Sequence, residues 1–159
     1  MWKILQIIFW TWIPVFELRF SIPYGIYKLE MNWFMVFIVA IIANIFLGIV
    51  IYIILEWLIK IFTKIPFINL LWQKYIDKTQ IKIQSGVEKY GEWAIAIFIA
   101  VPLPGSGVYT GAVAAFLIGL DQKKFFIANI IGVLIAGILV TILSLTLGNM
   151  AGIFLKSAG

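Results

Sequence analysis

The sequence predicts an all-α integral membrane protein built as an inverted repeat of two units, each a re-entrant helical hairpin followed by one transmembrane helix. Three observations predict this fold class: the composition, long runs without charge, and an internal repeat. Of the 159 residues, 64% are apolar and only 12% are charged, whereas a soluble domain carries about 25% charged residues. The chain is therefore too apolar to present a water-facing surface.

Four stretches contain no charged residue: 4–16, 31–55, 93–120 and 125–155. A helix needs about 20 apolar residues to cross the hydrocarbon core of a bilayer, so the first run is too short to span. The runs 31–55 and 125–155 predict two transmembrane helices, with Asn32 and Asp121 placed as their N-caps.

The run 93–120 does not read as a plain helix, because residues 101–107 are Val-Pro-Leu-Pro-Gly-Ser-Gly. Two prolines and two glycines there remove successive helical hydrogen bonds, and the arm before them is only about 14 Å long. Two half-length arms joined by such a tip predict a re-entrant hairpin, which must be sheltered by protein or line a wet cavity. One kinked spanning helix is the alternative.

An internal repeat appears when the chain is shifted by 89 positions. The residue pairs that then coincide include Asn32 with Asp121, Phe37 with Phe126, and Gly48 with Gly137. Within one membrane domain, 1–159, the first repeat is 2–55 and the second is 91–148. We expect the first hairpin over residues 4–28, with its tip near 14–23. A hairpin returns to the side from which it entered, so each repeat crosses the membrane once and the two repeats have opposite orientations.

Residues 60–90 form the only substantial polar segment. They carry six lysines, and the apolar residues cluster in the first half, which predicts an amphipathic helix on the membrane face; a solvated connector is the alternative. All eight lysines from Lys60 to Lys124 fall on one side of the predicted membrane. The positive-inside rule makes this side cytoplasmic, in a multi-pass protein of the plasma membrane.

Small residues recur every four positions on both predicted transmembrane helices, a spacing that lets membrane helices approach closely. They are Ala40, Asn44 and Gly48 on the first helix and Ala128, Gly132 and Ala136 on the second. Asn44 and Asn129 would each need an interhelical hydrogen bond. This pattern predicts packing and identifies no substrate.

The first hairpin carries the candidate site, because Glu17 and Arg19 are the only charged residues between Lys3 and Lys28. A charge inside the membrane is costly and is by default functional. The planar fork of Arg19 suits a phosphate or carboxylate, and Glu17 is suited to take up a proton because burial favours a neutral carboxyl group. The two side chains would face each other only on a non-helical tip. The alternative is an ion pair at the headgroup level.

The second hairpin has no charge, but its glycines expose backbone N–H groups at the N-terminus of a half-helix, which is a natural anion cradle. Its candidate residues are Pro102, Pro104, Gly105, Ser106, Gly107, Tyr109 and Thr110.

Several classes of function are disfavoured. The chain has no cysteine and no histidine, which excludes thiolate metal sites and removes the commonest general base. We therefore expect no enzyme, no metal site and no cofactor. Nucleic-acid binding is also not expected, because no basic stretch is interleaved with stacking aromatics on a soluble module.

Four segments carry a resemblance to a known family: Glu-Leu-Arg-Phe-Ser-Ile-Pro-Tyr-Gly at 17–25, Glu-Lys-Tyr-Gly-Glu-Trp at 88–93, Val-Pro-Leu-Pro-Gly-Ser-Gly-Val-Tyr-Thr-Gly-Ala at 101–112 and Gly-Leu-Asp-Gln-Lys-Lys-Phe at 119–125. With them the chain resembles the putative small multidrug export protein family over nearly its whole length. That family is similar in plan to the DedA membrane protein superfamily, with two facing re-entrant hairpins.

The resemblance implies membrane transport. For DedA relatives it implies translocation of lipids, polyprenyl phosphates included, with proton coupling through acidic residues. Glu17 and Arg19 match the acidic and basic positions of the first hairpin. The second hairpin departs from DedA proteins, because no arginine follows its proline, and this argues against a polyprenyl phosphate as the substrate.

The sequence as a whole predicts a small transporter of amphiphilic or anionic substrates, either lipid phosphates or drug-like molecules, with proton coupling and a site between two opposed hairpins. Its expected partners are membrane lipids, the substrate and a second copy of the chain in a homodimer. The alternative is a non-transporting membrane protein in lipid organisation or membrane assembly, acting through the lysine-rich segment 60–90.

Overall fold

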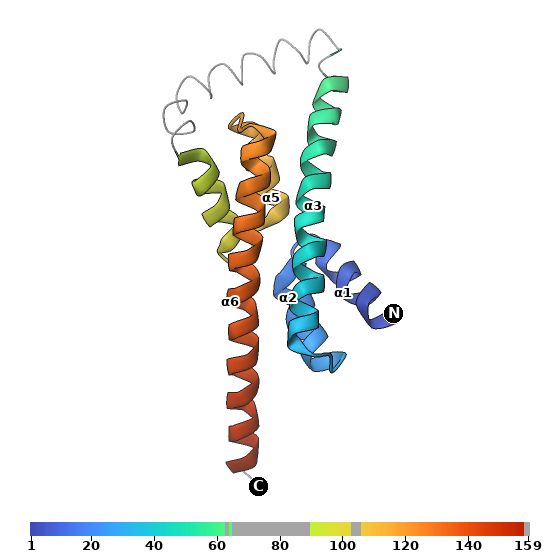
Figure 1. Cartoon of the computed structure of the whole chain (residues 1–159), viewed down its shortest axis with the longest axis vertical. Helices are drawn as coiled ribbons and strands as arrows, with labels where there is room; N and C mark the ends of the chain where they lie inside the picture. Colours follow the sequence, from blue (N-terminus) through green and yellow to red (C-terminus); the bar gives the residue numbers. More distant parts are fainter. Residues whose placement is uncertain (63, 65–89, 103–105, 158–159) are drawn as a thin grey trace. The chain divides into compact units, whose positions relative to one another are not determined.

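The computed structural model of the chain is helical (Figure 1). It describes residues 1–62, 64, 90–102 and 106–157, and the side chains of the last helix as far as residue 147. No strand occurs in these described ranges. The elements in order are α1 (Trp2–Trp12), α2 (Glu17–Pro23), the π-helix η1 (Tyr24–Lys28), α3 (Trp33–Phe62), the helix Tyr90–Ala100, α5 (Val108–Leu117) and α6 (Gln122–Ser157). The expected amphipathic helix of segment 60–90 falls almost wholly outside the described residues.

Two of these helices are long and apolar enough to cross a membrane: α3, and the stretch Gln122–Leu147 of α6. They correspond to the two predicted transmembrane helices. α3 continues beyond the charge-free run to Phe62, because Glu56 and Lys60 are good helix formers and do not end it.

Both helices begin at the predicted caps. The side chain of Asn32 accepts a hydrogen bond from the backbone N–H of Phe34 at 2.9 Å. The carboxylate of Asp121 accepts the equivalent bond from Lys123 at 3.0 Å. Each cap satisfies a backbone donor that the helix itself leaves without a partner.

The run 93–120 is not one continuous helix. The helix Tyr90–Ala100 ends before the Pro/Gly segment, and α5 begins after it at Val108. At 1.5 Å per residue, each is about 15 Å long, roughly half the thickness of the hydrocarbon core. The described residues therefore form two short helices in place of one continuous helix.

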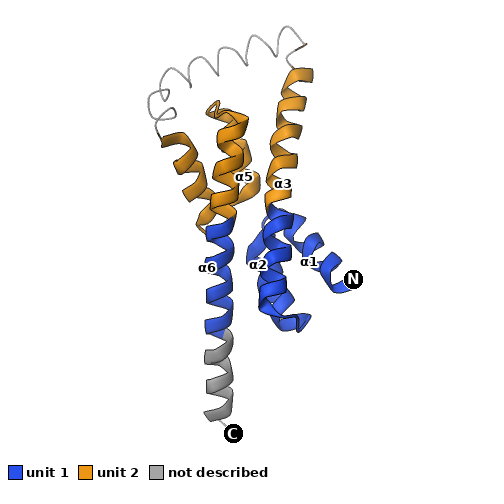
Figure 2. Cartoon of the chain, in the orientation of Figure 1, with its two compact units in different colours: residues 1–44, 134–159 blue, residues 45–133 orange. Residues whose placement is uncertain are grey.

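The chain divides into two compact units (Figure 2). Unit 1 comprises residues 1–44 and 134–159, and unit 2 comprises residues 45–133. Unit 1 thus contains the first hairpin, the beginning of α3 and the end of α6. Unit 2 contains the second hairpin, the end of α3 and the beginning of α6.

In unit 1, residues 2–28 form a helical hairpin whose two ends meet. At its open end, Lys3 Nζ donates a hydrogen bond to the backbone oxygen of Leu29 at 2.8 Å. One turn further in, the Tyr24 hydroxyl donates to Gln6 Oε1 at 3.4 Å. The two arms therefore run antiparallel over their length.

The tip of this hairpin is shorter than predicted. α1 ends at Trp12, Ile13 is extended, and α2 begins at Glu17. Pro23 lies inside the returning arm rather than at the tip. Because proline lacks an N–H donor, the ordinary helical ladder cannot continue through it, and the arm changes to the π-helix η1, where Leu29 N–H donates to the Tyr24 oxygen at 3.1 Å.

Unit 2 is held by a close helix crossing. Asn129 Nδ2 on α6 donates to the backbone oxygen of Ile45 on α3 at 3.0 Å, so the predicted interhelical bond of Asn129 is confirmed. A methyl group added at Gly48 would lie 2.5 Å from Asn129 Nδ2. Only glycine at position 48 lets the two backbones come this close, as the small-residue pattern predicted.

The second hairpin packs against the start of α6 in the same way. A Cβ at Gly111 would lie 2.5 Å from Ile99 Cγ1, and a Cβ at Gly132 would lie 2.7 Å from the backbone oxygen of Ala96. At the far end of the unit, the Tyr52 ring stacks on Phe125 with centroids 4.5 Å apart.

Candidate functional site

Glu17 is the first residue of α2, directly after the tip of the first hairpin. Only 6% of its surface is exposed, which is unusual for a carboxylate. Its backbone N–H donates to the Ile13 oxygen at 3.3 Å, which closes the turn. The chain thus turns back sharply enough to place an acidic side chain in the interior of unit 1.

The backbone at this tip is strained. Val15 has φ 81° and Glu17 has φ 42°, both in the left-handed region that β-branched and long side chains rarely occupy. Val15 is 75% exposed, so no packing of its own side chain compensates. Strained backbone of this kind concentrates at ligand sites and switch regions.

Arg19 lies two residues further along α2 and is half-buried. The structure thus places both charged residues predicted for the first hairpin at the start of one short helix, directly after the tip.

Two buried hydroxyl groups near Glu17 were not among the predicted residues. Thr11 Oγ1 lies 2.8 Å from the Ile7 backbone oxygen and 2.8 Å from Ser21 Oγ, and Thr11 and Ser21 are both 0% exposed. A hydroxyl has one proton, so when Thr11 donates to Ile7, Ser21 donates to Thr11. Ser21 follows Glu17 by four residues, and this helical spacing was the available signal.

An aromatic cluster covers another side of the same hairpin. Trp10 of α1 lies against Phe16, Phe20 and Tyr24 of the returning arm, with ring centroids 4.8 to 5.8 Å apart. The three returning rings follow one another at intervals of four residues, so they share one face of the arm. This cluster packs the two arms of the hairpin together.

The structure describes only some of the candidate site residues predicted for the second hairpin. Pro104 and Gly105 lie outside the described residues, and Pro102 is half-buried. Ser106 Oγ donates to the backbone oxygen of Val101 across the break. This hydroxyl therefore helps to close the tip.

Gly107 precedes α5 with φ 123° and ψ −169°, a conformation essentially confined to glycine. Tyr109 is half-buried and Thr110 is exposed, and the Thr110 hydroxyl donates to the Gly107 oxygen at 3.4 Å. The glycine thus has a conformational role at the start of the helix, which the sequence pattern alone did not separate from a binding role.

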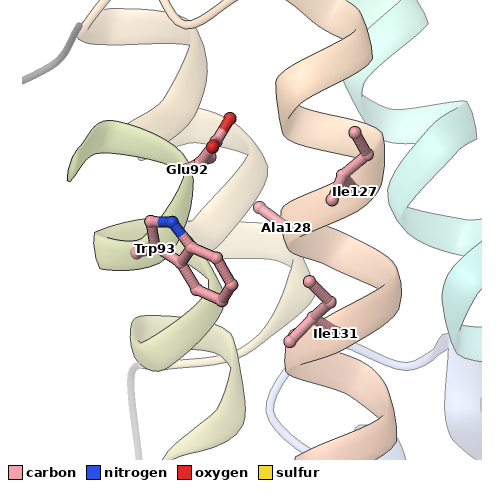
Figure 3. Close-up of a pocket in the computed structure, with 5 residues that line it drawn as sticks. All are labelled: Glu92, Trp93, Ile127, Ala128 and Ile131. Carbon is pink, nitrogen blue, oxygen red and sulfur yellow. The ribbon is translucent and has the colours of Figure 1, made fainter. Parts of the chain in front are cut away.

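A small hollow lies in unit 2 between the helix Tyr90–Ala100 and α6 (Figure 3). It is lined by Glu92, Trp93, Ile127, Ala128 and Ile131, and its volume is about 20 Å³. That is room for about one water molecule, whereas sites for drug-sized ligands measure roughly 300–1,000 Å³. Across the described parts of the chain, no three acidic side chains gather to hold a metal ion.

Comparison with known proteins gives one match. The model of a family described as "Putative small multi-drug export protein" matches residues 17–139. The matched range begins at Glu17 and includes the second hairpin and the first half of α6. No curated protein and no solved structure matches the chain.

Proposed function

The chain belongs to the small multi-drug export protein family, and from this membership we propose that it is a proton-coupled membrane transporter of amphiphilic or anionic substrates. The family description favours transport over catalysis, and the two spanning-length helices agree with a membrane protein. The proposal adds a site at the first hairpin and a re-entrant, inverted arrangement of the two repeats.

The inverted repeat is supported by where the elements begin and end. α3 starts at Trp33 and α6 at Gln122, 89 positions apart. The returning arms end at Lys28 and Leu117, again 89 positions apart. The sequence shift therefore coincides with a repeat of helix boundaries, which abundant isoleucine alone would not produce. A hairpin whose ends meet adds no net crossing, so one spanning helix per repeat reverses the orientation of the next.

One observation carries the site: a carboxylate that is 6% exposed lies where the helical hairpin turns. A charge buried in a membrane protein costs several kcal/mol, and such residues mark substrate and ion pathways. Glu17 would take up a proton, because a neutral carboxyl group is far easier to bury than a carboxylate.

Arg19 would bind the anionic group of the substrate. It is half-buried, whereas Glu17 is buried, so the guanidinium is the more accessible of the two charged groups. A planar fork of donors suits a phosphate or carboxylate headgroup. Proton and anion would thus be carried by neighbouring but separate side chains.

The test is a flux assay with the full chain reconstituted in liposomes that contain a pH-sensitive dye. The probes are a fluorescent acyl phosphate and, for comparison, a fluorescent quaternary ammonium amphiphile. We expect Glu17→Gln to abolish proton movement coupled to the acyl phosphate, and Arg19→Ala to remove the preference for the anionic probe. Glu56→Gln, outside both hairpins, serves as the matched carboxylate control.

Unchanged flux in both hairpin variants would remove these roles. If in addition deletion of residues 67–85 abolished function in cells, lipid organisation by the lysine-rich segment would be the better description. Because two spanning helices make a thin wall around a substrate, the proposal also includes assembly as a homodimer, measurable by the mass of the detergent-solubilised protein.

A further inference from the structure

Polar residues are unevenly distributed between the interiors of the two units. Among the described side chains, seven polar or charged residues are buried, and six of them belong to unit 1. Those six are Thr11, Glu17, Ser21, Asn44, Thr141 and Ser144, and the seventh is Asn129 of unit 2. Most of the buried polar groups in the described part of the chain therefore lie in unit 1.

Two of the six leave an oxygen without a hydrogen-bond partner. Asn44 Oδ1 and Thr141 Oγ1 are buried and form no hydrogen bond. By contrast, Ser144 Oγ donates to the Val140 oxygen at 2.8 Å, and Thr11 and Ser21 bond each other. A buried polar atom without a partner costs about 1–3 kcal/mol, so each of these oxygens is a place where a ligand or a second state of the protein would supply the missing bond.

Along the length of the first hairpin, Asn44 lies level with the tip that carries Glu17. The indole N–H of Trp12, the last residue of α1, donates to the backbone oxygen of Ala43 at 3.2 Å. Ala43 is the neighbour of Asn44 in α3. The chain turns immediately after Trp12, and the Glu17 backbone N–H donates a hydrogen bond to the Ile13 oxygen. Glu17 and Asn44 therefore lie in the same compact unit, on segments that the contact between Trp12 and Ala43 brings together.

Thr141 lies on α6, nearer the open end of the first hairpin than its tip. Gly137 on α6 packs against Ile41 of α3, and the Tyr27 hydroxyl, near the open end of the hairpin, donates to the Ser144 oxygen. Thr141 falls between Gly137 and Ser144 in α6, toward the open end and away from the tip. The two partnerless oxygens are thus alike in burial but differ in their distance along the hairpin.

We propose that Asn44 is the positioning residue for the proton on Glu17: its carbonyl oxygen accepts a hydrogen bond from the protonated carboxyl group, directly or through one water. This rests on the proposed function, in which Glu17 takes up a proton. An ionised carboxylate only accepts hydrogen bonds, but a protonated one gains an O–H donor that needs an acceptor. The missing donor at Asn44 and the new donor on Glu17 complement each other, so Asn44 stabilises the protonated state.

Few other charges surround this pair. The charged and titratable side chains in the described part of unit 1 are Lys3, Arg19, Tyr24, Tyr27, Lys28 and Glu30. The side chains of Lys3 and Tyr24 form hydrogen bonds near the open end of the hairpin, and Tyr27 bonds α6. Lys28 is the last residue of the returning arm, and Glu30 follows it. Neither α3 as far as Asn44 nor residues 134–147 of α6 carry a charge. Arg19, two residues along α2, is the charge that bears most directly on Glu17.

The experiment measures the pH dependence of acyl phosphate flux in liposomes for the full chain and three variants. Asn44→Leu removes the acceptor with little change in volume, and we expect the pH of half-maximal flux to move toward acid by about one unit, the equivalent of one hydrogen bond. Asn44→Ser retains an oxygen acceptor and should shift the profile less. Thr141→Val, which removes the other partnerless oxygen of unit 1, should leave the profile unchanged.

An unshifted profile in Asn44→Leu, or an equal shift in Thr141→Val, would overturn the proposal. A change from proton dependence to sodium dependence in Asn44→Leu would also overturn it, because the acceptor would then serve a metal ion. If Asn44→Leu does not fold, Asn44→Ser decides between these outcomes. Glu17→Gln separates the two proposals: if it moves substrate normally, the proposed function fails; if it is inactive while Asn44 variants match wild type, only this inference fails.

Discussion

The hydroxyl oxygens of Thr11 and Ser21 lie 2.8 Å apart and join the two arms of the first hairpin at a fully buried point. We expect Thr11→Val to destabilise the protein by about 1 kcal/mol, because it removes two hydrogen bonds of the kind worth roughly 0.6 kcal/mol each in membrane proteins. Unfolding by SDS titration in mixed micelles measures this change.

The same pair allows a double-mutant test. Thr11→Val leaves Ser21 without its partner, whereas Thr11→Val with Ser21→Ala removes both polar groups. The combined loss should therefore be smaller than the sum of the single losses. Strict additivity would show that the two hydroxyls do not interact.

The crossing of Gly48 and Asn129 gives a second prediction. Gly48→Ala places a methyl group 2.5 Å from Asn129 Nδ2, and we expect it to break the Asn129 bond to Ile45 and to destabilise unit 2 by roughly 1–3 kcal/mol. Asn129→Ala in the same chain should restore part of that loss, because the smaller side chain makes room. The readout is again micellar unfolding, and no rescue would argue against this contact.

Two glycines with positive φ should differ in which substitutions they tolerate. Gly107 has φ 123°, which is essentially reserved for glycine, whereas Gly119 has φ 71°, where asparagine is tolerated. Gly119 ends α5 in a Schellman arrangement, with its N–H on the Phe116 oxygen and that of Leu120 on the Ala115 oxygen. We expect Gly107→Asn to cost roughly 1–3 kcal/mol in thermal or SDS unfolding, and Gly119→Asn only a few tenths. Equal destabilisation by the two substitutions would contradict this difference between the backbone conformations of Gly107 and Gly119.

The proposed topology is testable because the chain has no cysteine. We expect single cysteines at positions 3 and 28 to react with a membrane-impermeant maleimide from outside the cell, and a cysteine at exposed Lys123 only after permeabilisation. Labelling of positions 3 and 28 from opposite sides would show that residues 2–28 cross the membrane, which a re-entrant hairpin does not do.

Much of the helical framework follows from local chemistry. Asn32 and Asp121 predicted the starts of α3 and α6, since a capping side chain acts within its own turn. The prolines and glycines of 101–107 predicted the break between two short helices for the same reason. In both cases the interaction joins residues that are close in sequence.

The interior of the site was less accessible to prediction. Thr11 bonds Ser21 ten residues away, and the partnerless oxygen of Asn44 depends on contacts between α1, α3 and their neighbours. The burial of Glu17 likewise depends on where the tip ends and α2 begins. Such features depend on how helices pack, and the periodicity of one segment does not contain that information.

The first hairpin has a consequence for synthesis of the chain. Unit 2 is one uninterrupted stretch, residues 45–133, whereas unit 1 combines residues 1–44 with residues 134–159. Because a nascent chain emerges from its N-terminus, the hairpin that holds Glu17 is made before unit 2 and meets Ser144, the partner of Tyr27, only after unit 2 has been made. Chains terminated at residue 133 would possess every residue of unit 2, while unit 1 would lack residues 134–144 and its hairpin would stay accessible to the insertion machinery and to quality control.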